Sequence, residues 1–257
     1  MSRIFLMAAA ILITFSSFAQ KAKKEKKEEN RKRLNALSKQ EEEGVIAYRR
    51  HTVFGGKLIN DGYGVFMEIG RSQSVKKAML YQLELSERKS PREEKQSNAQ
   101  NYASPYIYGK QNFVYPLRLG MQQQILFGNK SNKNGVSITG NYGGGLAVAL
   151  LRPYYVRLSS TGNYVKYESS DSAAFLGNDI YSGPGFSKGW NDLTIDPGAY
   201  VKTALRFDYG SYNEIVSAIE VGITAEYYSK KIPIIVREPH KQFFFSGYVS
   251  ILFGKRK

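Results

Sequence analysis

The residues of this 257-residue chain that could carry chemistry are charged side chains that alternate with apolar ones. Where every second residue is apolar, the residues between them share the opposite face of a β-strand. Seven charged residues fall on such second faces: Glu68, Glu84, Arg118, Lys202, Arg206, Glu220 and Glu226. Charges removed from water are costly unless they are paired, and three cations with four carboxylates can form a near-neutral network. We predict that this network fills and rigidifies an interior; the alternative is a narrow polar conduit or gate.

The two histidines are the candidates for acid–base catalysis, because imidazole titrates near neutral pH. His51 precedes the first expected strand. His240 follows the seventh, beside Glu238 and Lys241, in the connection that leads to the last expected strand and could lie at the rim of the fold. A single loop histidine is usually a surface residue, so we predict no catalytic residue.

Other common chemistries are disfavoured. The chain has no cysteine, which excludes disulfides, thiolate metal sites and cysteine nucleophiles. The Gly143-Gly144-Gly145 run lacks the Gly-Lys-Ser/Thr sequence of a phosphate loop, and glycine within a strand typically marks a bend or a close approach. We predict no cofactor and no metal.

Eight segments of alternating character are the elements that must position the charged residues. They are residues 53–60, 63–70, 79–86, 113–122, 136–150, 201–209, 215–227 and 243–253. One face of each is large and apolar, whereas the other carries small and charged residues. A soluble sandwich also alternates in this way, so the segments alone leave two architectures open.

The connections between the segments separate these architectures. Those at residues 72–75, 128–134 and 210–213 are short, whereas those at 87–111 and 158–197 are long and that at 229–242 is intermediate. Short turns at one end and long loops at the other are typical of outer-membrane barrels; the tight turn at residues 60–62 is the exception. We therefore predict an all-β fold, a closed antiparallel transmembrane β-barrel of eight strands over residues 46–257. An extra hairpin within residues 158–197 would change the count by two.

The N-terminus predicts export. A cationic start, an apolar run at residues 4–18 and Ser17-Phe18-Ala19 indicate a cleaved signal peptide at residues 1–19, too short for a membrane-spanning helix. We expect residues 20–45 to be a charged periplasmic extension that is weakly helical or disordered; the alternative is a segment that docks on a partner. The net charge of +15 would suit binding to nucleic acid. Because we expect the protein to be exported, we predict lipopolysaccharide or acidic envelope proteins as its partners, and no nucleic acid.

Five short segments are distinctive: YGKQN at residues 108–112, LRLG at 117–120, LRPYY at 151–155, DPGAYVK at 196–202 and LFGK at 252–255. They resemble segments of a family of small outer-membrane β-barrel proteins of the Bacteroidota. The resemblance covers about residues 46–257 and implies a barrel fold in the bacterial outer membrane rather than an activity. By analogy, small barrels of that phylum serve as accessory subunits of secretion or barrel-assembly machines.

The functional prediction combines these observations. We expect a non-enzymatic outer-membrane barrel that acts as a structural or interaction subunit of a cell-envelope assembly or secretion complex. Its partners would contact the external loops or the N-terminal extension. The alternatives are a narrow pore and an outer-membrane lipid-modifying enzyme.

Overall fold

The computed structural model describes residues 50–74, 76–96, 104–129, 135–168, 172–210 and 214–256, all within one compact unit, Tyr48–Lys257. The expected signal peptide at residues 1–19 and charged extension at residues 20–45 lie outside the described residues, and both stay predictions.

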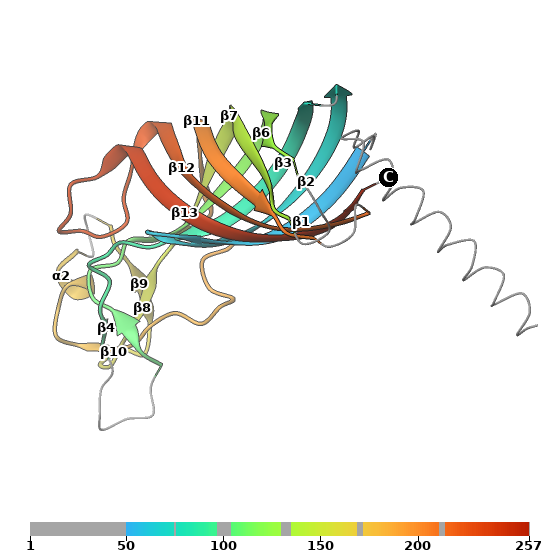
Figure 1. Ribbon diagram of the computed structural model, residues 1–257. Helices are drawn as coiled ribbons and strands as arrows, with labels where there is room; N and C mark the ends of the chain where they lie inside the picture. Colours follow the sequence, from blue (N-terminus) through green and yellow to red (C-terminus); the bar gives the residue numbers. More distant parts are fainter. Residues whose placement is uncertain are drawn as a thin grey trace, which may run out of the picture. The chain divides into compact units, whose positions relative to one another are not determined.

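Eight antiparallel strands close into a barrel, in the order β1-β13-β12-β11-β7-β6-β3-β2 (Figure 1). They are β1 (Arg50–Ile59), β2 (Gly62–Ser74), β3 (Lys77–Arg88), β6 (Asn112–Gly128), β7 (Ser137–Pro153), β11 (Thr194–Asp208), β12 (Ile215–Ile232) and β13 (Lys241–Arg256). Each strand pairs with its neighbour along the chain, and β1 pairs with β13 to close the ring. The predicted closed antiparallel β-barrel of eight strands is confirmed.

The alternating pattern decides which face of each strand is outside. The large apolar residues point outward, as Val65, Leu146 and Val201 show with exposed fractions of 63%, 67% and 63%. The residues between them point inward and are buried. This arrangement suits a bilayer, where the outer face meets lipid and side chains fill the narrow interior of an eight-stranded barrel. Among the described residues, no helix has the length and apolar character needed to cross a membrane.

The glycine run in β7 marks a close approach of strands. Gly143 and Gly145 pair with Gln122 and Gly120 of β6. A Cβ atom at either position would overlap a backbone carbonyl oxygen of β6, that of Met121 or Leu119. The interpretation of this run as a close approach is therefore correct, because only glycine leaves room for the neighbouring strand here.

The described parts of the long connections at one end of the barrel fold into a cap, defined here as residues 89–96, 104–111, 154–168 and 172–193. One sheet has the order β10-β8-β9 and the other pairs β4 with β5. The elements are β4 (Lys95–Gln96), β5 (Tyr106–Ile107), β8 (Tyr155–Leu158), β9 (Tyr164–Lys166), α2 (Ser172–Phe175) and β10 (Ile180–Ser182). The possible extra hairpin thus lies in a separate sheet, and the barrel keeps eight strands.

The cap has its own apolar core, which contains Ile107, Tyr154, Val156, Phe175 and Ile180. Backbone hydrogen bonds join it to the strand ends: the Tyr154 N–H donates to the Gln111 carbonyl and the Gln111 N–H donates to the Ile234 carbonyl, both at 2.8 Å. This end of the barrel, as far as it is described, is therefore a packed structure rather than a set of separate loops.

Candidate functional site: the charge network of the barrel interior

The seven charged residues singled out from the sequence all lie inside the barrel, each no more than 4% exposed. They come from five strands: Glu68 from β2, Glu84 from β3, Arg118 from β6, Lys202 and Arg206 from β11, and Glu220 and Glu226 from β12. Strand closure brings their side chains together although up to 158 positions separate them along the chain.

Arg118 is the centre of the half of the network nearer the cap. Its Nη1 lies 2.5 Å from Glu84 Oε1, and its Nη2 lies 2.5 Å from Glu226 Oε1. Lys57 Nζ of β1 approaches the other oxygen of Glu84, also at 2.5 Å. Both carboxylates are thus paired with cations, and all of these side chains are buried.

Arg88 extends this half to the rim. Its Nη2 lies 2.9 Å from Glu226 Oε1, and its Nε lies 2.6 Å from Asp61 Oδ2 in the β1–β2 turn. Three cations (Lys57, Arg88, Arg118) and three carboxylates (Asp61, Glu84, Glu226) therefore sum to zero charge.

Arg206 organises the half farther from the cap. It forms a bidentate pair with Glu68, Nη1 to Oε1 and Nη2 to Oε2, both at 2.7 Å. Its Nε and Nη2 also donate to Glu220 Oε2 at 2.9 and 2.7 Å. Lys202 Nζ lies 2.9 Å from Glu220 Oε1. These two cations and two carboxylates again sum to zero.

Tyr248 of β13 joins the two halves. Its ring centroid lies 4.0 Å from Lys57 Nζ and 5.1 Å from Lys202 Nζ, so the aromatic face contributes cation–π attraction to both. Its hydroxyl donates to Glu220 Oε1 at 2.7 Å. The network thus continues from the rim turn at Asp61 to Glu68, through ten charged side chains that are neutral in sum.

Three of these ten charges were missed in the sequence, namely Lys57, Arg88 and Asp61. Lys57 was hidden because Gly55 and Gly56 interrupt the apolar alternation of β1. Every second residue of a strand shares a face, so Lys57 lies on the same inward face as Val53, and Arg88 lies on the same inward face as Glu84. Continuing the alternation along both strands would have found both cations. Asp61 occupies a turn, where parity gives no signal.

The histidines occupy different environments. The placement of His51 ahead of the first strand is wrong, because β1 begins at Arg50 and carries His51 inward. The ring is 4% exposed, with Nε2 3.4 Å from Glu68 Oε1. His240 lies in the exposed β12–β13 connection, as expected. In the described part of the chain no three His, Cys, Asp or Glu side chains are grouped as a metal site would require.

Comparison with known proteins gives structural neighbours but no relative by sequence. No family model and no curated protein matches the chain. The structural neighbours are small β-barrel proteins. The N-terminal β-barrel domain of Pseudomonas aeruginosa OprF aligns with a TM-score of 0.38 at 10% identity, covering 80% of this chain and 98% of that one. Neisserial surface protein A aligns with a TM-score of 0.38 at 10% identity, covering 81% of this chain and 96% of that one. The Yersinia pestis attachment invasion locus protein Ail aligns with a TM-score of 0.36 at 8% identity, covering 82% of this chain and 100% of that one. The barrel assignment rests on the closed strand pairing described above.

A second cluster lies on the outside of the barrel, near the cap. Arg152 points outward from β7, yet it is only 3% exposed because aromatic rings cover it. Its guanidinium lies 4.1 Å from the ring centroid of Phe113 and 4.8 Å from that of Trp190. Its Nη1 donates to the Phe186 carbonyl at 2.7 Å. Trp190, the only tryptophan of the chain, remains 40% exposed and Phe186 81% exposed. Aromatic rings with a cation at the end of an apolar wall are typical of a bilayer interface.

In the cap, Tyr154 shows how burial tunes a titratable group. Burial raises the pKa of Tyr154 to about 12, although the Ile107 N–H, which donates to its hydroxyl at 2.8 Å, partly opposes the rise. Burial also lowers the pKa of Lys110, against the opposing effect of Glu93 at 2.7 Å. Both pKa shifts arise from burial and therefore depend on the packing of the cap.

Proposed function

We propose that the protein is a non-enzymatic bacterial outer-membrane barrel that acts as a structural or interaction subunit of a cell-envelope assembly or secretion complex. The apolar outer face of the strands supports a membrane location, because a soluble barrel would expose these side chains to water. The predicted signal peptide at residues 1–19 supports export.

The observation that carries the proposal is the contrast between interior and cap. Ten paired charges lie along the described interior from the rim turn to Glu68, so an ion entering the barrel would meet ion pairs along its way. The external connections, in contrast, form a cap with its own core. A barrel built in this way offers surfaces rather than a conduit, so the cap and the N-terminal extension are the proposed contact surfaces for envelope proteins.

Conductance separates this function from the narrow pore. The full-length protein, folded into a planar bilayer, should show no steady openings, because any ion would have to break dry ion pairs to pass. An eight-stranded barrel known to conduct serves as the positive control of insertion. Steady openings would overturn the structural role.

Purification tests the partner directly. Cross-linking in intact cells, followed by native purification, should recover the protein with a stoichiometric envelope protein. The double variant Arg157→Glu/Lys188→Glu, which reverses two cap charges, should reduce that recovery, whereas Lys76→Glu/Lys77→Glu at the opposite end should not. Recovery of the barrel alone at native abundance would overturn the subunit role.

A further inference from the structure

The barrel wall is lower at one place on its external rim. β1 and β2 are joined by a turn at Asn60-Asp61, and the β1–β13 pairing ends where Ile59 meets Tyr248. The Asn60 N–H then donates to the Gly247 carbonyl at 3.1 Å. Among the described strands, residues 241–246 of β13 pair only with β12. These six residues of β13 span about 20 Å, at roughly 3.3 Å per residue, and border a gap in the wall above the β1–β2 turn. We call this gap the notch.

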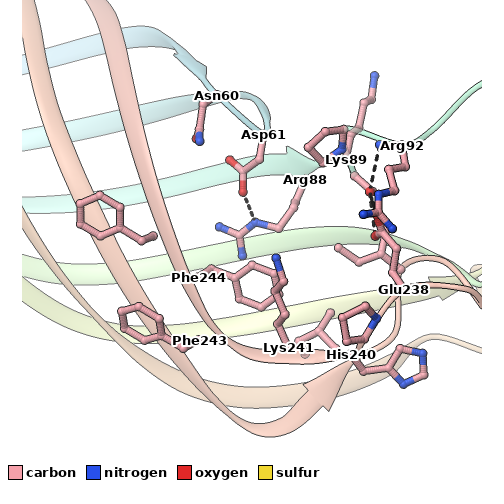
Figure 2. A pocket seen from close by; sticks show the side chains of 16 residues that line it. Asn60, Asp61, Arg88, Lys89, Arg92, Glu238, His240, Lys241, Phe243 and Phe244 are labelled. Carbon is pink, nitrogen blue, oxygen red and sulfur yellow. Dashed lines mark hydrogen bonds and ion pairs between the residues drawn. The ribbon is translucent and has the colours of Figure 1, made fainter.

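A pocket of about 360 Å³ lies in this notch (Figure 2). The turn residues Asn60 and Asp61 line it together with residues 88–92 at the end of β3 and residues 238–241 and 243–245 before and within β13. Ile232 and Ile234 contribute apolar lining. The pocket is therefore built by segments that come together only through barrel closure.

The pocket carries an excess of positive charge. Its lining holds four cations, Arg88, Lys89, Arg92 and Lys241, against two carboxylates, Asp61 and Glu238. Arg88 is neutralised inside the wall by Asp61, and Figure 2 shows the two side chains facing each other. Arg92 lies 3.5 Å from Glu238.

Lys89 and Lys241 supply the remaining charge. The Lys89 side chain is 41% exposed and Lys241 is exposed, so both can turn toward a ligand. Lys89 Nζ lies 3.9 Å from a Glu87 carboxylate oxygen, which is long for an ion pair, and 4.8 Å from the centroid of the Tyr63 ring. The two lysines come from different segments of the pocket lining, directly after β3 and at the start of β13, and ammonium groups donate strong charge-assisted hydrogen bonds to phosphate oxygens.

The outer side of the pocket is apolar. Phe243 and Phe245 point outward from β13, with exposed fractions of 56% and 60%, and continue the apolar outer wall of the barrel. A ligand in the notch therefore meets ammonium groups at the rim and aromatic rings toward the bilayer. This polarity matches an amphiphile whose phosphorylated headgroup lies above its acyl chains.

We propose that the notch binds a phosphorylated lipid of the outer leaflet, with Lys89 and Lys241 at the phosphate and Phe243 and Phe245 along an acyl chain. The inference rests on the proposed outer-membrane location and gives the protein a specific lipid site there. The competing occupant is a peptide strand added to the free edge of β13. The charge excess and the outward phenylalanines favour the lipid, because strand addition requires neither.

Native mass spectrometry of the full-length protein, folded in a zwitterionic detergent, measures the binding. Titration with diphosphorylated lipid A should give one saturable lipid per chain. Lys89→Gln/Lys241→Gln should weaken binding about tenfold, which is about 1.4 kcal/mol and within reach of two partly exposed charge pairs. Asn60→Trp, which fills the floor of the notch without changing charge, should weaken it to a similar degree.

The matched control is Arg157→Gln/Lys188→Gln, which removes two cations from the cap and should leave the affinity unchanged. Equal loss in the control, or full binding by the notch variants, would overturn the proposal. A copurifying peptide that cross-links to residues 241–246 and resists displacement by lipid A would also overturn it. Failure to insert into nanodiscs would refute the membrane location, whereas insertion without saturable lipid A binding would refute the notch site alone.

Discussion

Replacing Arg206 by methionine tests whether the charges inside the barrel are dry. Arg206 donates four hydrogen bonds, two to Glu68 and two to Glu220. Methionine fills similar space but leaves both carboxylates without their shared cation. Breaking a buried pair from one side costs about 3–5 kcal/mol, because the charge that remains is uncompensated.

The two carboxylates should contribute unequally to that loss. Glu220 keeps Lys202 at 2.9 Å, the Tyr248 hydroxyl at 2.7 Å and the Asn141 amide at 2.9 Å. Glu68 keeps a longer contact, to His51 at 3.4 Å. Most of the cost should therefore fall on Glu68. Adding Glu68→Gln, which removes that charge, should recover about 2 kcal/mol or more of the free energy of unfolding.

Denaturant unfolding from lipid vesicles, followed by the fluorescence of the single tryptophan, measures these differences. The exposed-site control, Arg157→Met, should stay within about 0.5 kcal/mol of the parent. A loss below about 1 kcal/mol for Arg206→Met, with no recovery on adding Glu68→Gln, would refute the reasoning. That result would mean that water solvates the interior, as in an open conduit.

Three further predictions concern the cap and the rim. The pKa of Tyr154 is about 12 in the folded protein, against 10.0 for the ordinary side chain, so the unfolded state loses its proton first as the pH rises. The cap should therefore lose up to about 2.7 kcal/mol of stability between pH 10 and pH 12. Limited proteolysis across this pH range should show the loss, and Tyr154→Phe should remove it. Trp190 should be quenched more by lipids brominated near the headgroup than by lipids brominated deep in the chain, with the reverse order for Leu146→Trp in a Trp190→Phe background; equal quenching would contradict the interface position. His240→Ala should leave the lipid profile of the cell unchanged, since we expect no catalytic role, and an altered profile would favour the lipid-modifying enzyme.

The sequence predicted the barrel well because alternation is a local property that closure does not change. The alternation of neighbouring residues predicts that the Val65 and Leu146 side chains point outward, and both do. The inward set followed from the same parity, so Glu68 and Glu220 could be named before any pairing was known. Their shared partner Arg206 could not be assigned, because register between β2, β11 and β12 depends on closure.

The cap and the notch were beyond the sequence for a different reason. The long connections show no helical period in the sequence. β8, which ends at Leu158, and the β9 and β10 strands that follow it are only three or four residues long, and they are held by tertiary packing around Phe175. The tight turn at residues 60–62 was visible, but as an exception to the loop-length rule. Its consequence, a lowered wall beside β13, requires knowledge of where the β1–β13 pairing ends.

Arg88 stands between the notch and the interior, which gives a last test. It lines the pocket, contacts the Phe244 ring at 4.2 Å and bridges Asp61 to Glu226. In Arg88→Gln, Glu226 keeps Arg118 at 2.5 Å and the Tyr228 hydroxyl at 2.6 Å.

The loss in Arg88→Gln should therefore be about 1–3 kcal/mol, smaller than for Arg206→Met. Planar-bilayer recordings should still show no openings, because Arg118, Glu84 and Lys57 remain across the interior beneath the notch. Steady openings in this variant, absent from the parent, would show that a single ion-pair layer at the rim seals the barrel. The notch would then be the mouth of a gated path rather than a lateral lipid site.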